Sequence, residues 1–375
     1  MGKKQSLKDV RDEKKGKVAG ANNQQDGNQK KDSSEREKAK SWAREWFDAI
    51  LFAFIAALII RTFFFEAFRI PTPSMEKTLL TGDFLVVSKI AYGPRTPMTI
   101  GIPFTNAYLP GLELPWARLP GFTDVERYDI VVFNYPIDIA SISRKTNYIK
   151  RCVGLPGDDL RIDDKVVYVN GEQAPQFKTV QKSYEVEVRE NIRLSPSKVR
   201  NAGGRIINSQ SQNIYRINMP QATAEQMRGW SEVRNVQLAI LPEQYNEFRN
   251  SRYTFSSDFN NADHMPQITV PYQGQEVTLT PENWHLYRNI IARYENNDAR
   301  LEDGEIIING EETNTYTIKK DYYFMMGDNR DNSQDSRFWG FVPDDHIVGK
   351  ASMIYFSWNH ERMLPRFGRM FNLIH

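Results

Sequence analysis

The chain has a single cysteine, few histidines and almost no net charge, and each of these shortages removes a class of protein. Among its 375 residues only Cys152 carries a thiol, which excludes intrachain disulfides and a cysteine-based zinc site. Lysine and arginine together number 49 and aspartate and glutamate 47, so no overall basic charge marks a nucleic-acid-binding protein. The five histidines form no HExxH motif or paired-ligand spacing. We therefore expect no metal, no cofactor and no nucleic-acid partner.

The first 45 residues are polar and basic. They hold thirteen lysines and arginines against eight acidic residues, with almost no large apolar side chain before Trp42. A segment of this composition cannot bury enough apolar surface to fold. We predict a disordered, basic tail over residues 1–45.

An apolar run of about twenty residues follows, over residues 46–66. At ~1.5 Å rise per residue such a helix spans a ~30 Å hydrocarbon core. Arg61 lies near the far end, where its stem can reach the headgroups, and Trp42 and Trp46 suit the near interface. A cleaved signal peptide is the alternative, but no A-x-A-like site follows. The positive-inside rule then places the basic tail in the cytoplasm and everything after Phe65 outside it.

Beyond this helix the sequence reads mainly as β-structure. Short β-branched and aromatic runs cover residues 84–90, 130–135, 148–153, 160–169, 315–326 and 347–358. Asn170-Gly171 and Asn309-Gly310 are predicted hairpin turns, because both residues of such turns need positive φ. We expect a β-rich domain over residues 67–175 and 321–358, followed by a C-terminal tail over residues 359–375.

Residues 176–320 carry no recognisable motif. Residues 222–233 and 281–296 look helical, the second opening with a Thr280 cap and Pro281. We expect an α+β accessory insertion of unknown role.

Residues 94–122 hold six prolines among large apolar side chains, including Trp116 and Phe122. We expect an apolar loop that cannot pair its backbone as helix or sheet. It either lines the core or dips into the membrane interface.

Three segments carry chemistry. Gly327–Gly340, here called the signature loop, is a run of turn-formers, charges and small hydroxyls with no apolar period, which is typical of a functional loop. Residues 70–79 read IPTPSMEKTL and residues 148–158 read YIKRCVGLPGD. The three segments, in the order in which they follow one another along the chain, resemble the bacterial type I signal peptidases, which release secreted proteins by cutting after their signal peptides. The resemblance runs from about Trp46 to Lys350 and is thin across residues 176–320.

Peptide hydrolysis by a serine requires a base that takes the hydroxyl proton, and usually a histidine supplies it. No histidine lies in the three segments, whereas Lys150 does. Lysine can act only when neutral, and burial lowers its pKa. Strand alternation places Tyr148, Lys150 and Cys152 on one face, where an apolar lining is plausible.

The resemblance assigns roles to these residues. Ser74 would be the nucleophile and Lys150 the general base of a serine–lysine dyad. Ser333 would hydrogen-bond the lysine amine, and Asp335 and Arg337 would support the loop as an ion pair. The Thr72 hydroxyl and the Ser74 backbone N–H would bind the oxyanion.

The same resemblance predicts two shallow pockets for small side chains at substrate positions −1 and −3. Their candidate residues are Phe68, Ile70, Pro71, Met75, Leu79, Tyr148 and Ile149. Ordinary core packing is the alternative for each of them. An extended substrate would add as a strand to an open sheet edge, with backbone hydrogen bonds giving affinity and the pockets giving specificity.

One departure from the family pattern opens a second interpretation. Where S-M-x-P-T-L is common, this chain has Lys77 in place of proline, which creates the S-x-x-K spacing of β-lactamases and penicillin-binding proteins. That class also needs S-D-N and K-T-G motifs, which the sequence lacks, and a strand-like run from Phe84 follows too closely for the long helix after the serine. A membrane-anchored β domain that only binds is a third interpretation.

The sequence thus predicts a single-pass protein of the bacterial cytoplasmic membrane that removes signal peptides through a Ser-Lys acyl-enzyme mechanism. Its catalytic domain would be extracytoplasmic and its N-terminus cytoplasmic. Its partners would be the signal peptides of preproteins, the lipid bilayer and, as a further candidate, the secretion translocon.

Overall fold

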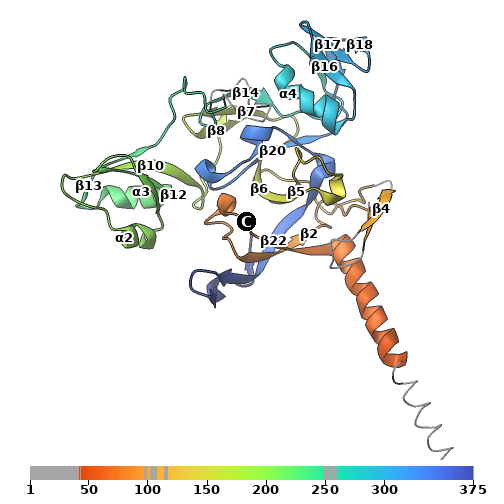
Figure 1. The fold of residues 1–375 in the computed structure, drawn as a ribbon, viewed down its shortest axis with the longest axis horizontal. Coiled ribbons are helices and arrows are strands. Elements are labelled where there is room, and N and C mark those ends of the chain that lie inside the picture. The colour runs from red at the N-terminus through yellow and green to blue at the C-terminus, as the bar shows by residue number, and fades with distance from the viewer. Residues whose placement is uncertain are drawn as a thin grey trace, which may run out of the picture. The chain divides into compact units, whose positions relative to one another are not determined.

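The structure is a computed structural model that describes residues 42, 44–96, 99–101, 108–113, 117–248, 255, 259 and 261–374. It divides into two compact units, Met1–Arg61 and Thr62–His375. The predicted tail over residues 1–45 lies almost wholly outside the described residues. One helix, Arg44–Phe64, is long and apolar enough to cross a membrane, and its apolar stretch is not buried (Figure 1). The predicted span of 46–66 has the same length but lies two residues too far along the chain, because Phe65 already starts a strand.

A large antiparallel sheet forms the centre of the second unit (Figure 1). Its strand order is β1-β2-β22-β5-β6-β20-β21, and β1 forms one end of this path. The strands are β1 (Phe65–Arg69), β2 (Asp83–Ser88), β5 (Ile130–Asn134), β6 (Asn147–Gly154), β20 (Tyr322–Met326), β21 (Val342–Pro343) and β22 (Ile347–Asn359). The mainly β fold predicted from alternating apolar runs is confirmed.

Two of the predicted strands are each divided by a turn. Residues 160–169 form the hairpin β7 (Asp159–Asp163) and β8 (Val166–Val169). Asp164 and Lys165 turn the chain with φ of 48° and 64°. Residues 315–326 form β19 (Thr315–Thr317) and, after a break, β20.

Both predicted Asn-Gly turns are present. Asn170 and Gly171 have φ of 54° and 83°, and Asn309 and Gly310 have φ of 54° and 89°. The first pair joins β8 to β9 (Glu172–Gln173), and the second joins β17 (Glu305–Ile308) to β18 (Glu311–Glu312). Asparagine and glycine tolerate the left-handed region that such turns demand.

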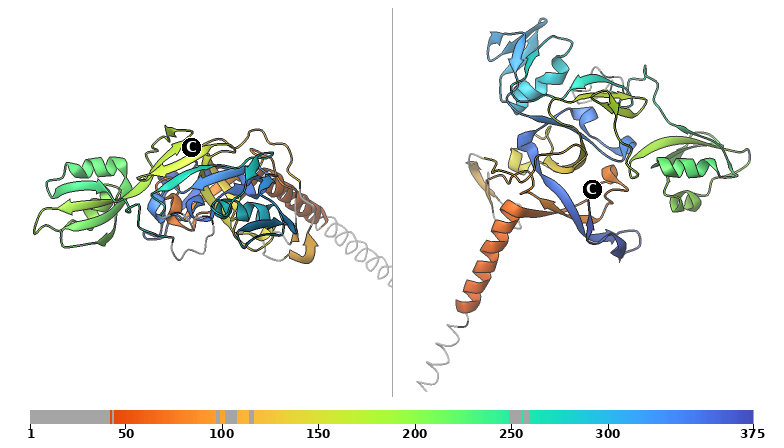
Figure 2. Two further views of the ribbon diagram at one scale, coloured as in Figure 1. Left: turned by 90° about the horizontal axis from the view of Figure 1, so that it is seen from above. Right: turned by 180° about the vertical axis from the view of Figure 1, so that it is seen from behind.

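Residues 176–320, predicted as one accessory insertion, divide into two parts, of which the first has an apolar core of its own. The first part, here called the β10–β13 lobe, spans residues 181–238. Its sheet has the order β11-β12-β10-β13, and two short helices pack on one face of it (Figure 2). The elements are β10 (Gln181–Val188), α2 (Pro196–Asn201), β11 (Arg205–Ser209), β12 (Ile214–Pro220), α3 (Gln221–Arg228) and β13 (Val233–Leu238). Val186, Ile217 and Met227 are central to its own apolar core.

The second part shares its core with the large sheet. Its strand β14 (Met265–Thr269) pairs with β7, and side chains such as Trp284 and Ile291 belong to the same apolar cluster as Phe324 of β20. The remaining elements are β15 (Glu276–Thr278), α4 (Trp284–Arg288), the π-helix Asn289–Tyr294 and β16 (Ala299–Glu302). This part therefore extends the catalytic domain, since β7 offers it a strand edge.

The two predicted helices exist but are shorter than expected. Residues 222–233 contain α3, which ends at Arg228, and the helical stretch predicted at 281 begins only at Trp284. The residue at the cap position of this helix is Asn283, and Thr280 forms hydrogen bonds with it in the turn before the helix. The Thr280 hydroxyl accepts from Asn283 N at 3.3 Å, and its own N–H donates to Asn283 Oδ1 at 2.8 Å.

Residues 359–375 do not form a free tail. Strands β23 (Leu364–Pro365) and β24 (Asn372–Leu373) pair with β22. Arg369 Nη2 lies 2.6 Å from a carboxylate oxygen of Asp83, which is fully buried in β2. A buried carboxylate needs a charged partner, and the C-terminal segment supplies it.

The proline-rich segment 94–122 also differs from its prediction. Within it, β3 (Thr99–Gly101) pairs with β4 (Tyr108–Glu113), although the sequence suggested an unpaired loop. A two-stranded ribbon tolerates Pro110 because only one edge of each strand is bonded. Residues 97, 98, 102–107 and 114–116 lie outside the described residues, so the choice between core and membrane stays open there.

Candidate active site

Ser74 lies in a short 3-10 helix, η2 (Pro73–Met75), that follows β1. Pro73 presets the first helical φ, and Thr72 before it is extended, with φ of −123° and ψ of 155°. Ser74 is only 7% exposed. Its carbonyl accepts a hydrogen bond of 3.0 Å from Asn329 N, so the signature loop holds the backbone of this serine.

Lys150 reaches Ser74 from the large sheet. Lys150 is paired with Val131 in the register of β6 and β5, and it is 3% exposed. Its Nζ lies 2.6 Å from Ser74 Oγ and 3.1 Å from the carbonyl oxygen of Ile149. The fold thus brings the two predicted dyad residues, 76 positions apart in sequence, into hydrogen-bond contact.

The surroundings of Lys150 favour its neutral form. Burial lowers the pKa of Lys150 to about 8, an effect that the charge of Asp335 opposes and that of Arg337 assists. The ammonium lies 5.4 Å from the ring centre of Tyr148, and Cys152 is fully buried in the same apolar cluster as Tyr148. Alternation along β6 therefore gives the apolar lining that the sequence suggested.

The signature loop contains the predicted ion pair. Arg337 Nε and Nη2 lie 2.8 and 2.9 Å from the two carboxylate oxygens of Asp335, which is fully buried. Asp335 also accepts a hydrogen bond from Gly327 N at 2.9 Å. Burial would raise the pKa of Asp335, but Arg337 outweighs it and the pKa is lowered. This pair closes the loop on itself.

Ser333 does not make the predicted bond to the lysine. Its Oγ is buried and has no hydrogen-bond partner among the described residues. Ser333 packs against Gly327, where an added Cβ would lie 2.2 Å from Ser333 Oγ. The contacts of the Lys150 amine are instead with Ser74 Oγ and the Ile149 carbonyl.

Two further buried charges fix the loop to β6. Arg151 follows Lys150 and donates to both carboxylate oxygens of Asp328, at 2.9 and 2.7 Å. Both side chains are at most 2% exposed. Asp328 also accepts from Thr78 Oγ1 at 2.5 Å. The sequence analysis gave Arg151 no role, although a charged residue inside an apolar strand is a signal of a buried pair.

The β10–β13 lobe contributes Asn218, which the sequence analysis also missed. Asn218 Nδ2 donates to Asn329 Oδ1 at 2.5 Å, and both residues are buried. Asn329 in turn donates through its backbone N–H to the carbonyl of Ser74 and through Nδ2 to that of Pro73. An asparagine between Ile217 and Met219 of a strand is unusual, and this is the only signal the sequence offers.

Both predicted oxyanion donors are unengaged. Thr72 is exposed and its hydroxyl makes no capping hydrogen bond to η2. Among the described residues the Ser74 N–H has no backbone acceptor. Thr72 lies two residues before Ser74 in the sequence, and the N–H belongs to Ser74 itself.

The predicted pocket residues separate by burial. Ile70, Met75 and Leu79 are buried in one apolar cluster, as the core alternative anticipated. Phe68 and Ile149 are half-buried and pack against a second cluster, Tyr148 is half-buried in a third, and Pro71 is exposed.

Lys77, the basis of the S-x-x-K interpretation, has no hydrogen bond to Ser74, whereas Lys150 does. Its Nζ lies instead 3.6 Å from the place that a Cβ of Gly203 would occupy. Lys77 has a φ of 76°, which proline cannot adopt, so this backbone has no room for the family's proline.

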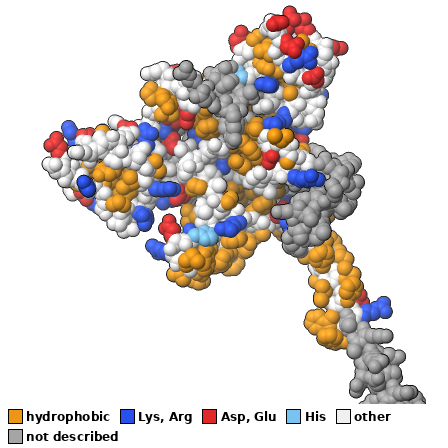
Figure 3. Space-filling view, viewed as in Figure 1, with side chains coloured by type: hydrophobic (Ala, Val, Ile, Leu, Met, Phe, Trp, Pro, Cys, Tyr) orange, Lys and Arg blue, Asp and Glu red, His pale blue; other side chains and the backbone are white. Residues whose placement is uncertain are grey.

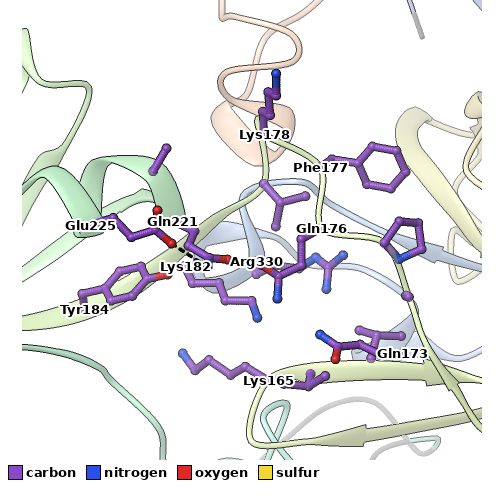
Figure 4. Close-up of a pocket in the computed structure, with 16 residues that line it drawn as sticks. Lys165, Gln173, Gln176, Phe177, Lys178, Lys182, Tyr184, Gln221, Glu225 and Arg330 are labelled. Atoms are coloured by element: carbon purple, nitrogen blue, oxygen red, sulfur yellow. Dashed lines mark hydrogen bonds between the residues drawn. The ribbon is translucent and has the colours of Figure 1, made fainter.

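Other clusters lie apart from the dyad. Asp163, Asp164 and His264 could hold a metal ion, since their ligand atoms lie within 4.8 Å of one another, but the two carboxylates are exposed. A cavity of about 230 Å³ borders the signature loop at Arg330, with Lys165 and Lys182 around it (Figure 4). Neither Ser74 nor Lys150 lines that cavity.

A buried serine–lysine pair beside an antiparallel sheet is an arrangement that serine peptidases of the dyad class use. The chain matches the model of the family "Signal peptidase, peptidase S26" over residues 43–255 and 265–358. A signal peptidase I from Buchnera aphidicola is 30% identical over 331 residues, covering 87% of this chain and 79% of the relative. One from Pseudomonas aeruginosa is 29% identical, covering 84% and 73%.

A crystal structure of a signal peptidase I from Enterococcus faecalis is 18% identical and covers 61% of this chain and 98% of that one, with a TM-score of 0.21. The chain belongs to the signal peptidase family, peptidase S26. It is a membrane-bound serine endopeptidase that acts on the signal peptides of preproteins, as the sequence predicted.

Proposed function

We propose that Ser74 is the nucleophile and Lys150 the general base of this peptidase. The observation that carries the proposal is the 2.6 Å contact between Lys150 Nζ and Ser74 Oγ in a site where Lys150 is 3% exposed. A desolvated amine with a pKa of about 8 is partly neutral near physiological pH and can accept the serine proton.

Acylation would begin as Ser74 Oγ attacks the scissile carbonyl and its proton passes to Lys150 Nζ. The Ser74 N–H and the Thr72 hydroxyl would donate to the oxyanion of the tetrahedral intermediate. The C–N bond then breaks and Lys150 returns its proton to the leaving amine, which is the new N-terminus of the mature protein. In deacylation, Lys150 takes a proton from water, hydroxide attacks the ester, and the proton returns to Ser74.

Two strand edges support the proposal that the substrate binds as a strand. β1 lies at one end of the sheet path and is bonded only to β2. β6 pairs with β20 only from Arg151 onward, so its stretch Asn147–Lys150 is bonded by β5 on one side alone. Unpaired N–H and C=O groups on such edges can bind an extended peptide next to Ser74.

The −1 and −3 pockets would then be lined in two layers. Phe68, Tyr148 and Ile149 keep part of their surface exposed and would contact the small substrate side chains directly. Exposed Pro71 would border them. Ile70, Met75 and Leu79 would support this wall from the buried side, because they are at most 3% exposed.

The membrane topology is proposed from the sequence and from exposed apolar surface. The basic tail would be cytoplasmic and the catalytic domain extracytoplasmic, in a bacterial cytoplasmic membrane, where the secretion translocon is a candidate partner. Exposed apolar side chains of the C-terminal segment support the proposal that the domain contacts lipid. Five large apolar side chains are 61–76% exposed there: Met363, Leu364, Phe367, Phe371 and Leu373. Figure 3 shows hydrophobic side chains gathered at the lower edge of the domain. Aromatic side chains with nearby arginines suit the headgroup boundary.

The test is cleavage of a purified preprotein by the full chain in detergent, with the cut identified by mass spectrometry. We expect cleavage after an A-x-A site, no loss of rate with EDTA, and no cleavage by Ser74→Ala. Persistent cleavage by Ser74→Ala would remove the proposed nucleophile.

A further inference from the structure

A cleft of about 780 Å³ opens beside the nucleophile. One wall is the segment after Ser74, a second is the β10–β13 lobe and a third is the C-terminal segment. Its lining includes Pro73, Lys77, Gln181, Arg200, Arg205 and His360. The lining thus includes Pro73, the residue that precedes Ser74 in the sequence.

The lining of the cleft carries a net positive charge. Lys77, Arg200 and Arg205 make no ion pair or hydrogen bond through their side chains with any described residue. Arg366 also lines the cleft, but it donates to the Thr81 carbonyl and lies 3.9 Å from Asp83. Two carboxylates, those of Glu76 and Glu361, face these cations. The three cations without an ion pair therefore outnumber the two carboxylates in the lining, so the cleft has a net positive charge.

The path of the substrate chain on either side of the scissile bond determines which part of it can enter this cleft. In the proposed complex the residues before the scissile bond follow the edges of β1 and β6. The chain after that bond must leave Ser74 on another path, and the cleft starts at Pro73. At about 3.3 Å per residue, five extended residues cover roughly 16 Å. The first residues of the mature protein can therefore reach the cations of the lobe.

We propose that this cleft binds the first residues of the mature protein and that Lys77, Arg200 and Arg205 select acidic side chains there. The inference rests on the proposed function, since it takes Ser74 as the point of cleavage. It also gives a role to Lys77, which is not part of the proposed Ser74–Lys150 dyad. Lys77 has a left-handed backbone, and its amine lies near Gly203 of the lobe. The proline that is common at this position in the family would carry no charge.

The test uses preproteins with one signal peptide and identical residues at −3 and −1. Positions +3 to +5 carry three aspartates, three asparagines or three lysines. We expect kcat/KM to fall in that order, with about a tenfold difference between the acidic and basic substrates, because each partly exposed ion pair contributes only modestly to binding. The difference should shrink at 1 M NaCl, where charges are screened beyond about 3 Å.

Charge reversal locates the effect. The double variant Arg200→Glu, Arg205→Glu should invert the preference, and Lys77→Gln should weaken it. The matched control is Arg234→Glu, because Arg234 lies on β13 outside the cleft lining, is 68% exposed and pairs with Glu187. It should leave the acidic-to-basic ratio as in the wild type.

Each outcome bears on the inference. Equal rates for the acidic and basic substrates, with the asparagine substrate still cleaved, would overturn the cleft while leaving the proposed function intact. An equal change of ratio in Arg234→Glu would assign the preference to the overall field of the lobe and would also overturn it. If the double variant does not fold, Lys77→Gln and the salt series decide. Failure to cleave any of the three substrates would count against the proposed function itself.

Discussion

Asn218 Nδ2 donates a hydrogen bond of 2.5 Å to Oδ1 of Asn329, which links a strand of the β10–β13 lobe to the signature loop. Asn329 is fully buried and holds the carbonyls of both Pro73 and Ser74. Gln181 of the lobe adds a bond from its N–H to the Asp328 carbonyl at 2.8 Å. The lobe thus braces the segment that carries the nucleophile, although it contributes no reacting group.

We predict that Asn218→Ala slows chemistry more than it weakens binding. Without its donor, Asn329 loses the fixed orientation through which it holds Pro73 and Ser74. We expect kcat to fall roughly 10- to 100-fold, because small misplacements of a reacting group are costly, with little change in KM. Asn218→Asp should be as slow, since a carboxylate cannot donate to Asn329 Oδ1. Steady-state kinetics on a preprotein measures both parameters.

The control for this prediction is Asn235→Ala, since Asn235 is an exposed asparagine on β13 of the same lobe. It should retain wild-type kcat. A purely structural role for Asn218 would show itself as a lowered Tm in Asn218→Ala with kcat preserved in the folded fraction, and that result would contradict the positioning role.

The base assignment predicts opposite effects at two lysines. Lys150→Ala and Lys150→Arg should both abolish cleavage, the second because a guanidinium stays protonated at any usable pH. Lys77→Ala should leave most of the rate on a neutral substrate cleaved at the same site, because Lys77 has no contact with Ser74. Single-turnover cleavage measures all three. An inactive Lys77→Ala together with an active Lys150→Ala would restore the S-x-x-K interpretation.

The lowered pKa of Lys150 predicts a pH profile. As the pH rises through about 8 the amine becomes neutral, so kcat/KM should rise with a midpoint near that value. In Lys150→Met no such rise can occur. The profile is measured with a preprotein substrate between pH 6 and 10. A midpoint near the ordinary lysine value of 10.5 with full activity at neutral pH would remove the neutral-lysine mechanism.

The same shift predicts a change in stability. The folded state holds Lys150 with a pKa of about 8 and the unfolded state with one near 10.5, so below pH 8 the buried charge destabilises the fold, and this loss disappears as the pH rises toward 10.5. Lys150→Met should therefore be more stable than the wild type at pH 7, by up to roughly 3 kcal/mol. Denaturant unfolding at pH 7 and pH 10 checks whether the gain fades.

Glycine at position 327 should be indispensable. A Cβ there would lie 2.2 Å from Ser333 Oγ and 2.7 Å from the Ser74 carbonyl oxygen, so Gly327→Ala must displace either the loop or the nucleophile. We expect activity to fall at least about 100-fold. Ser333→Ala should lose much less, because its hydroxyl makes no hydrogen bond in the described structure. Gly368→Ala is the control, since a Cβ there meets nothing within 4 Å.

The exposed apolar C-terminal segment should bind lipid. The double variant Phe367→Ser, Phe371→Ser removes two side chains that are 76% and 72% exposed, and it should reduce vesicle binding of a chain that begins at Thr62. That start preserves β1, which a start at Phe68 would cut. Co-sedimentation with vesicles measures the effect. Ile139→Ser, at a side chain 92% exposed elsewhere, is the control, and an equal loss in both would contradict a specific lipid surface.

Local sequence determined the elements and the chemistry of this protein. The apolar run before Phe65 indicates a helix, the alternation around Lys150 indicates a strand with one apolar face, and Asn170-Gly171 specifies its own turn. These depend on neighbouring residues, because side-chain period and backbone propensity act over a few positions. The residue types of Ser74 and Lys150, with the signature loop, were enough to indicate the reaction.

Only the tertiary structure decided which residues meet. Nothing local in the sequence separates Lys150 from Lys77 as the partner of Ser74, and the strand pairing of β6 makes that choice. The same holds for Asn218, whose role depends on a bond to Asn329 across 111 positions, and for the C-terminal segment, which folds back because Asp83 is buried and needs Arg369. Long-range pairing of buried polar groups follows from the whole fold, since the cost of leaving such groups unpaired arises only once the core excludes water.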